Sequence, residues 1–196
     1  MPIRLLTSGG GTTTIQPTTS ASSVTLTVPS VNANVVTTGD TASVTQAMLG
    51  SGLAGTGPSF SAYNGGGSQS VTSGVVTKVA LTSTLFDTAA CFNTSTYRFL
   101  PLIAGYYQIN CNLSWSTGSG SGYAGLNLYK NGSNYQYASA QPAGNGNYHG
   151  VFLGSIVYLN GSTDYVELYC QYNGTSWSVI AGSGFTSMSG FLARAA

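Results

Sequence analysis

The strongest constraint on the fold is a strict two-residue alternation in the middle of the chain. Between Tyr106 and Trp115 the odd-numbered residues are apolar or aromatic, and the even-numbered ones are mostly amides and serine. Residues 164–172 repeat the pattern with the apolar side chains at even positions. Successive side chains of a β-strand point to opposite faces, so each segment predicts a strand with one face in a core and one polar face.

Turn signals separate these strands from further extended runs. Asn-Gly pairs, which favour tight hairpin turns, stand at 131–132, 160–161 and 173–174. Other runs rich in β-branched and aromatic residues bring the expected strand count to about eight to ten; they cover 74–81, 97–100, 123–130, 149–159, 177–181 and 190–194. Short strands without helical periodicity predict an all-β sandwich.

Charge is scarce. The 196 residues include five Lys or Arg and four Asp or Glu, whereas about a quarter of the residues in an ordinary soluble domain are charged. A surface of Ser, Thr, Asn, Gly and Tyr lets identical subunits associate at little electrostatic cost, which favours a permanent assembly. The scattered basic residues predict no nucleic-acid partner, and no apolar run is long enough for a membrane span.

The first 57 residues differ from the remainder. A Gly9–Gly11 joint precedes an uncharged Thr- and Val-rich stretch, in which 22–28 has strand periodicity and 41–49 could form a short helix before a Gly-rich linker at 50–57. Such a segment has too little apolar surface to fold alone. We therefore expect residues 1–57 to be an extended stem and attachment segment, and 58–196 to be the folded head.

Residues 81–111 resemble the signature of the C1q-like domain. Asp87, Phe92, Phe99, Gly105 and Tyr107 have the spacing of that signature, while Leu81, Ile109 and Cys111 stand where it has aromatic residues. Segments 58–63, 130–132, 154–168 and 189–192, which includes Phe191, extend the resemblance over 58–196. It implies a ten-stranded jelly roll that packs as a homotrimer around an apolar axis, with Asp87, Phe92, Phe99, Gly105, Tyr107 and Phe191 in the fold or trimer core.

The N-terminal segment is similar instead to repeats of bacteriophage tail fibres. Thr12–Pro17, Val24–Pro29 and Val35–Gly39 carry this likeness, and no Gly-X-Y repeat of a collagen stalk is present. The start of the chain is too short in apolar residues for a secretory signal. We therefore expect synthesis in a host cytoplasm, release by lysis and an external place on the virion, with residues 1–40 bound to tail, baseplate or capsid proteins.

Candidate chemistry is sparse. His149 is the single histidine, no Gly-x-Ser-x-Gly elbow is present, and Asp164 and Glu167 would lie on opposite faces of a strand. Cys91, Cys111 and Cys170 are odd in number, so buried free thiols are expected, with a Cys-based metal or redox site as the alternative. We predict no enzyme, no cofactor and no metal within one chain; a metal shared at a three-fold axis stays open.

Aromatic residues among small polar ones are the candidate ligand contacts: Trp115, Tyr123, Tyr135, Tyr137, Tyr148 and Trp177. Such mixtures suit sugar binding, and the alternative is packing at a trimer seam or at the core edge. The function expected from the sequence is a trimeric phage fibre or appendage whose head contacts a host-surface glycan. The alternatives are a capsid head-fibre or decoration protein without host recognition and, third, a depolymerase.

Overall fold

The computed structural model describes residues 3–6, 12–15, 57–117, 122–141, 148–174 and 177–196. The chain divides into two compact units, Met1–Val44 and Thr45–Ala196. In the first unit, β1 (Ile3–Leu6) pairs antiparallel with β2 (Thr12–Ile15). The strand expected at 22–28 and the helix expected at 41–49 lie outside the described residues.

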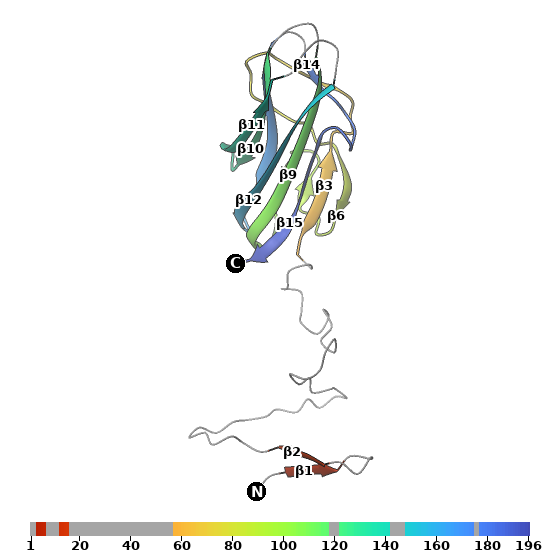
Figure 1. The fold of residues 1–196 in the computed structure, drawn as a ribbon, viewed down its shortest axis with the longest axis vertical. Coiled ribbons are helices and arrows are strands. Elements are labelled where there is room, and N and C mark those ends of the chain that lie inside the picture. The colour runs from red at the N-terminus through yellow and green to blue at the C-terminus, as the bar shows by residue number, and fades with distance from the viewer. Residues whose placement is uncertain (1–2, 7–11, 16–56, 118–121, 142–147, 175–176) are drawn as a thin grey trace. The chain divides into compact units, whose positions relative to one another are not determined.

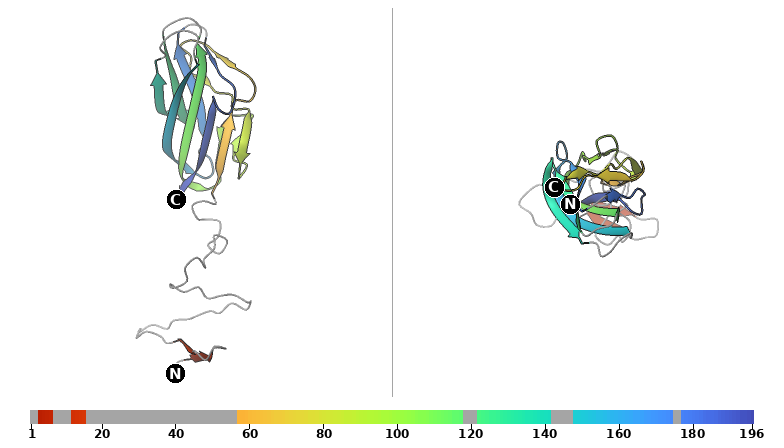
Figure 2. Two further views of the ribbon diagram at one scale, coloured as in Figure 1. Left: turned by 45° about the vertical axis from the view of Figure 1, so that its right-hand side comes forward. Right: turned by 90° about the horizontal axis from the view of Figure 1, so that it is seen from above.

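The second unit is a sandwich of two antiparallel sheets (Figures 1 and 2). The first sheet runs β4-β14-β9-β15-β3-β6, with β12 on the other edge of β9. Its strands are β3 (Ser59–Tyr63), β4 (Gln69–Val71), β6 (Ser83–Asp87), β9 (Ala104–Thr117), β12 (Tyr148–Asn160), β14 (Trp177–Val179) and β15 (Ser187–Ala195).

The second sheet is built around β13. Its order is β11-β10-β13-β8-β7, and β5 also pairs with β13. The strands are β5 (Thr77–Lys78), β7 (Phe92–Asn93), β8 (Arg98–Phe99), β10 (Tyr123–Lys130), β11 (Ser133–Ala140) and β13 (Val166–Asn173). The all-β sandwich fold is confirmed, and several very short strands raise the number in the head above the ten that the resemblance implies.

The core lies between the sheets and follows the alternation read from the sequence. The odd-numbered residues Tyr107 to Trp115 of β9 and the even-numbered residues Val166 to Tyr172 of β13 are all buried. At one end of the core the Phe60 and Phe99 rings stack with centroids 4.1 Å apart. Since both sheets supply alternate side chains to one apolar layer, the remaining side chains of each strand form the two outer faces of the head.

The Asn-Gly pair at 131–132 makes the predicted hairpin, whereas the pair at 160–161 turns the chain from one sheet to the other; the pair at 173–174 stands at the end of β13, before residues outside the described part. Asn131 and Gly132, with φ of 52° and 77°, connect β10 to β11. Gly161, with φ of 71°, follows β12 and turns the chain toward β13. Positive φ costs little at glycine and is tolerated by asparagine, which explains why the chain reverses at these positions.

Candidate interaction surface

One outer face of the sandwich exposes large apolar side chains. On β12 the odd-numbered apolar residues Val151, Leu153, Val157 and Leu159 are buried. The even-numbered residues Phe152, Ile156 and Tyr158 point outward, with 65%, 59% and 41% of their surfaces exposed. Gly154 lies between the first two on the same face. A soluble single chain rarely places such a column on one strand without covering it.

Cross-strand pairing extends this column into a surface. Tyr158 pairs with Tyr106 of β9, and their ring centroids are 5.4 Å apart. The next outward positions of β9, from Gln108 to Asn112, are polar and half-buried. Beyond them, on β15, Phe191 is half-exposed. We call the outer surface formed by Phe152, Ile156, Tyr158, Tyr106 and Phe191 the apolar face.

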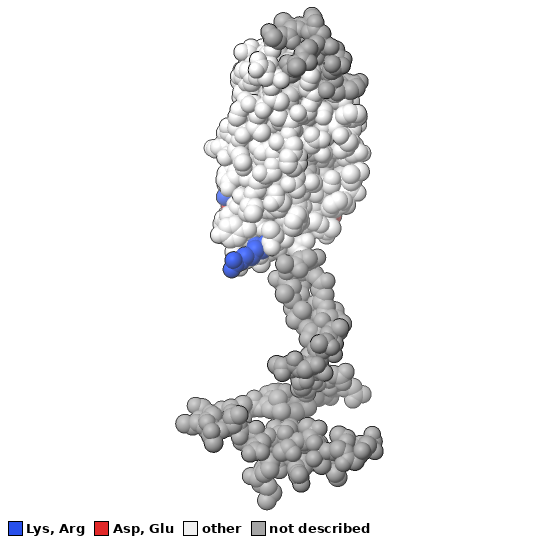
Figure 3. Space-filling view, in the orientation of Figure 1, with Lys and Arg blue, Asp and Glu red and all other residues white. Residues whose placement is uncertain are grey.

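Exposed apolar residues continue past β15 on the edge of the sheet. Leu85 and Phe86 of β6 are exposed, and β6 pairs with β3, which pairs with β15. This side of the sheet therefore has two apolar margins, one on edge strand β12 and one on edge strand β6, with the polar positions of β9 and Phe191 of β15 between them. Figure 3, which views this sheet from outside, shows few charged atoms over the described residues apart from Lys or Arg atoms at the lower end of the head. Arg194 of β15 pairs with Tyr106 of this face.

The other outer face is dominated by tyrosines. Tyr129 of β10 stacks on Tyr169 of β13 at 4.1 Å between centroids. Tyr165 and Tyr137 lie on the same sheet, and Tyr137 is half-exposed. We call this outer surface, with Tyr129, Tyr137, Tyr165 and Tyr169, the tyrosine face.

A buried carboxylate stabilises the tyrosine face. The Glu167 side chain is 1% exposed and pairs through Oε1 with Lys78 and with Arg98, whose Nε lies 2.6 Å away. The Arg98 guanidinium also lies 4.2 Å from the centre of the Tyr165 ring. The hydrogen bond to Glu167 raises the pKa of Arg98 further above its ordinary value. Both cations thus share Oε1 of one buried carboxylate, whose Oε2 has no hydrogen-bond partner among the described residues.

Tyr123, Tyr135 and Tyr137 are the predicted ligand residues found at the surface. All three are partly exposed on β10 and β11. The Tyr135 hydroxyl donates to the carbonyl oxygen of Ile156 at 3.2 Å, so that this side chain bridges to β12 of the other sheet. The side chain of Tyr148 lies outside the described residues. The structure thus separates Tyr135 from Tyr137, although they are two residues apart in the sequence.

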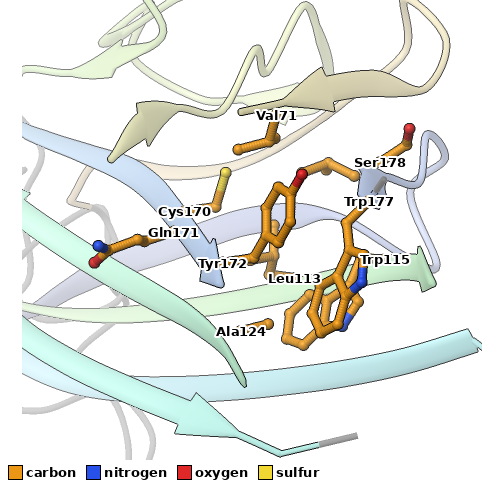
Figure 4. A pocket seen from close by; sticks show the side chains of 10 residues that line it. Val71, Leu113, Trp115, Ala124, Cys170, Gln171, Tyr172, Trp177 and Ser178 are labelled. Carbon is orange, nitrogen blue, oxygen red and sulfur yellow. The ribbon is translucent and has the colours of Figure 1, made fainter. Parts of the chain in front are cut away.

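The two tryptophans lie inside the sandwich. Trp115 and Trp177 are 2% and 3% exposed, with ring centroids 5.9 Å apart, and Tyr172 stacks on Trp177 at 5.1 Å. They line a small apolar cavity with Leu113 and Cys170 (Figure 4). In this conformation neither ring is accessible to a ligand at the surface. Both rings pack in the core, as in the alternative to ligand binding.

The residues taken from the C1q-like signature take three kinds of position. Phe92, Phe99 and Tyr107 are buried in the core. Asp87 accepts hydrogen bonds from the backbone N–H groups of Ala89, Cys91 and Phe92 and so shapes the loop after β6.

Gly105 of the signature and Phe191 of the supporting segment 189–192 belong to the first sheet. Gly105 pairs with Ala195, where a Cβ would meet the side chain of Leu192. Phe191 lies on the apolar face, exposed in the single chain.

The residues that could carry chemistry are isolated from one another. Cys91, Cys111 and Cys170 are free and buried, and burial raises the pKa of Cys111 and of Cys170 to about 12. Over the described residues, His, Cys, Asp and Glu form no group of three that could hold a metal. The described part of the chain also has no helix that could cross a membrane.

The surface role of Phe152 and Ile156 and the buried ion pairs of Glu167 were not predicted from the sequence. The signal for the first two was available, because 151–159 is apolar at both alternating sets of positions, as in a strand covered on both faces. For Glu167 no local signal existed, since its two cationic partners come from β5 and β8, which are distant in the sequence.

Comparison with known proteins shows the fold. No family model matches the sequence, and no curated protein does. Among solved structures, the globular domain of the zebrafish complement 1qA protein aligns with a TM-score of 0.51 and 18% identity, over 71% of this chain and 99% of that domain. The Eiger TNF of S. frugiperda aligns with a TM-score of 0.53 and 9% identity, over 71% of this chain and 96% of its own.

Murine APRIL gives a similar match. Its TM-score is 0.52 at 9% identity, over 69% of this chain and 98% of that structure. The head therefore has the jelly-roll fold of C1q- and TNF-like domains.

Proposed function

We propose that the chain is the subunit of a homotrimeric bacteriophage appendage, anchored to the particle through residues 1–40 and in contact with the host surface through its C1q-like head. The observation that carries the assembly is the apolar face. The jelly-roll fold with C1q- and TNF-like neighbours supports the same proposal. We assign it no catalytic activity.

The arrangement of the apolar face favours a ring over a two-fold dimer. Its apolar margins, Phe152 with Ile156 on edge strand β12 and Leu85 with Phe86 on edge strand β6, lie at opposite edges of the sheet. When the β12 margin of one subunit packs on the β6 margin of the next, each subunit uses both margins once. Such a heterologous contact gives a ring when the rotation between subunits closes, and a rotation that closes after three subunits gives the compact trimer that the resemblance implies.

Scarce charge supports a permanent assembly of this kind. Five basic and four acidic residues provide little repulsion between copies, and the described surface of this face shows few charged atoms in Figure 3. Obligate interfaces typically bury roughly 2,000 Å² or more and resemble a core cut in half. Light scattering should give a mass three times that of the 20.0 kDa chain at micromolar concentration; a single-chain mass would contradict the trimer.

The anchoring role rests on the first unit. β1 and β2 form a two-stranded hairpin, and an isolated hairpin is marginally stable in water, so a partner protein is expected to cover it. Deletion of residues 1–40 should prevent incorporation into particles and leave a folded trimeric head. Particles that still carry the truncated protein would contradict this role.

Localisation on intact particles separates the appendage from a capsid decoration protein. Microscopy of particles carrying the labelled protein should find a few trimers at the tail if it is a host-contacting fibre. Labelling spread over the capsid in tens to hundreds of copies would assign it to decoration instead.

A further inference from the structure

We infer that the tyrosine face carries a binding site for a neutral saccharide, centred on Tyr137 and Gly125. This inference rests on the proposed contact of the head with a host surface, and it gives that contact a place and a ligand class. The site lies on the sheet opposite the apolar face, so it remains accessible when the apolar face is covered by other subunits.

The Tyr137 ring lies on the backbone of the neighbouring strand. A Cβ placed at Gly125 would come within 3.0 Å of Tyr137 Cζ and 2.9 Å of its hydroxyl oxygen. Only glycine leaves this space, so the ring rests on β10 at Gly125, while 46% of the Tyr137 surface stays exposed. A ring held on the sheet with part of its surface in solvent is a preformed platform for the C–H face of a sugar.

Polar groups without charge surround this platform. Register places Gly125 directly between Ser139 of β11 and Gln171 of β13, and Tyr137 opposite Asn127. Ser139 is exposed and Gln171 is half-buried. Hydroxyl and amide groups beside an aromatic ring provide the donors and acceptors that saccharide hydroxyls need.

An unsatisfied amide next to the platform points to a ligand. Asn127 is 3% exposed; its Oδ1 accepts from Asn134 Nδ2 at 3.3 Å, and its own Nδ2 has no hydrogen-bond partner. Buried polar groups are nearly always paired, so this donor calls for an acceptor. Asn134 is exposed on an edge strand, and a shift of its side chain would free Asn127 Oδ1 to accept from a saccharide hydroxyl.

The charge distribution selects a neutral ligand. The charged side chains of this sheet are paired elsewhere: Lys78 and Arg98 with Glu167, and Lys130 with Asp164 at 3.0 Å. Gly125, Asn127, Tyr137, Ser139 and Gln171 include no ionisable group that is charged at neutral pH. An acidic sugar would therefore find no cation to pair with its carboxylate at this site. A neutral hexose or N-acetylhexosamine needs no such cation.

A single site of this kind binds a saccharide weakly, and three sites on one trimer would bind a glycan surface more tightly together. A single aromatic contact with a few hydrogen bonds corresponds to roughly millimolar affinity. Three sites on one head raise the effective concentration, so binding to a dense glycan surface is far tighter than binding to a free oligosaccharide.

The test uses the full chain on an immobilised panel of neutral oligosaccharides (hexose and N-acetylhexosamine) and acidic ones (uronic acid and sialylated). The strongest binder is then titrated in solution against the protein and three variants. Y137A removes the platform, and G125A displaces the ring through the clash described above. Y135A is the matched control, because Tyr135 is equally exposed on the same strand but bonds to Ile156 of the other sheet.

The inference expects binding to neutral oligosaccharides, at least a tenfold loss in Y137A and G125A, and less than a twofold change in Y135A. No binding to the panel, binding to acidic sugars alone, or equal losses in Y135A and Y137A would overturn it. Light scattering on the same samples keeps the two proposals separate. A single chain that binds the neutral sugar retains the site and contradicts the trimer, whereas a trimer that binds no sugar retains the assembly and contradicts the site.

Discussion

The two outer faces of the head arise from the same strand alternation but carry opposite chemistry. On the apolar face, β12 presents Phe152 and Ile156 largely to solvent. On the tyrosine face, the corresponding positions of β13 are Glu167, whose carboxylate is buried and paired, and the partly exposed Tyr169, and Tyr165 precedes the strand. The contrast teaches that inward positions fix the fold, whereas outward positions reveal which side meets another protein and which side meets solvent or ligand.

At the edge of β12, side chains of the second sheet bond to the backbone of the first sheet. Two side chains of the second sheet reach the edge of β12: Lys130 Nζ at the end of β10 donates to the Tyr158 carbonyl oxygen at 2.8 Å, and the Tyr135 hydroxyl of β11 donates to that of Ile156. These side chains occupy acceptors on the free edge of β12, and covering an edge in this way limits strand-to-strand addition. The proposed association would therefore use the side chains of the apolar face and not the backbone edge of β12.

The strongest test of the different roles of the two faces places a negative charge on each face in turn. F152D should dissociate the trimer, because a carboxylate buried at the interface without a partner costs about 3 kcal/mol or more per contact. Light scattering should show the mass fall to that of one chain. Y137D, which places the same charge on the tyrosine face, should leave the mass unchanged; dissociation by Y137D and not by F152D would reverse the roles of the faces.

The second test removes the charge that stabilises the tyrosine face. E167Q leaves Lys78 and Arg98 without their shared carboxylate, and breaking a buried pair typically costs 3–5 kcal/mol. Both cations keep partial hydration, with side-chain exposures of 27% and 38%, so we expect the low end, about 3 kcal/mol, or a Tm lowered by about 6–12 °C. Calorimetry of E167Q beside D164N, at a more exposed acid, measures it; equal Tm values for E167Q and wild type would contradict a structural role.

A smaller loss of stability is expected from replacing a glycine in either of two turns, one within a sheet and one between the sheets. Gly132 and Gly161 both have positive φ, but a Cβ at Gly132 would meet only the Tyr165 hydroxyl at 3.7 Å, whereas at Gly161 it would lie 2.6 Å from the Ile103 carbonyl carbon. G132A should therefore cost about 1 kcal/mol, for its backbone conformation alone. G161A should cost about 2 kcal/mol, because Ile103 and Ala104 must also move. Urea unfolding of both variants tests the order, and a larger loss in G132A would contradict it.

Local patterns were sufficient to predict the layers of the fold. The alternation in 106–115 and 164–172 placed the correct side chains of β9 and β13 in the core, and the pairs at 131–132 and 160–161 marked turns. These features depend on neighbours in the sequence, which is why they can be read without a structure.

The candidate sites depend on distant residues and could not be predicted in the same way. Trp115 and Trp177 stand beside polar, Gly- and Ser-rich stretches, which suggested ligand loops, but each packs on the other across β9 and β14. The platform at Tyr137 requires Gly125 of the neighbouring strand. A bulge between Leu128 and Tyr129 shifts the pairing of β11, so the spacing of Tyr135 and Tyr137 does not reveal that they serve different surfaces.

The smallest expected effect on stability comes from replacing Asp164, which lies in the loop between β12 and β13. β12 belongs to the apolar face and β13 to the tyrosine face. A hydrogen bond from Asn131, with help from Lys130 and the Asn160 N–H, lowers the pKa of Asp164 below its ordinary value. A depressed carboxyl pKa contributes stability above about pH 4, and that contribution is lost as the pH falls through the lower folded value.

Wild type and D164N should therefore differ by less than about 1 kcal/mol at pH 7, and the difference should shrink toward pH 2 as Asp164 is protonated. Urea unfolding at pH 7, 4 and 2 measures it. If the difference instead grew on acidification, Asp164 would be stabilising the loop in its protonated form, and the connection between the two faces would depend on a neutral hydrogen bond in place of the paired charge.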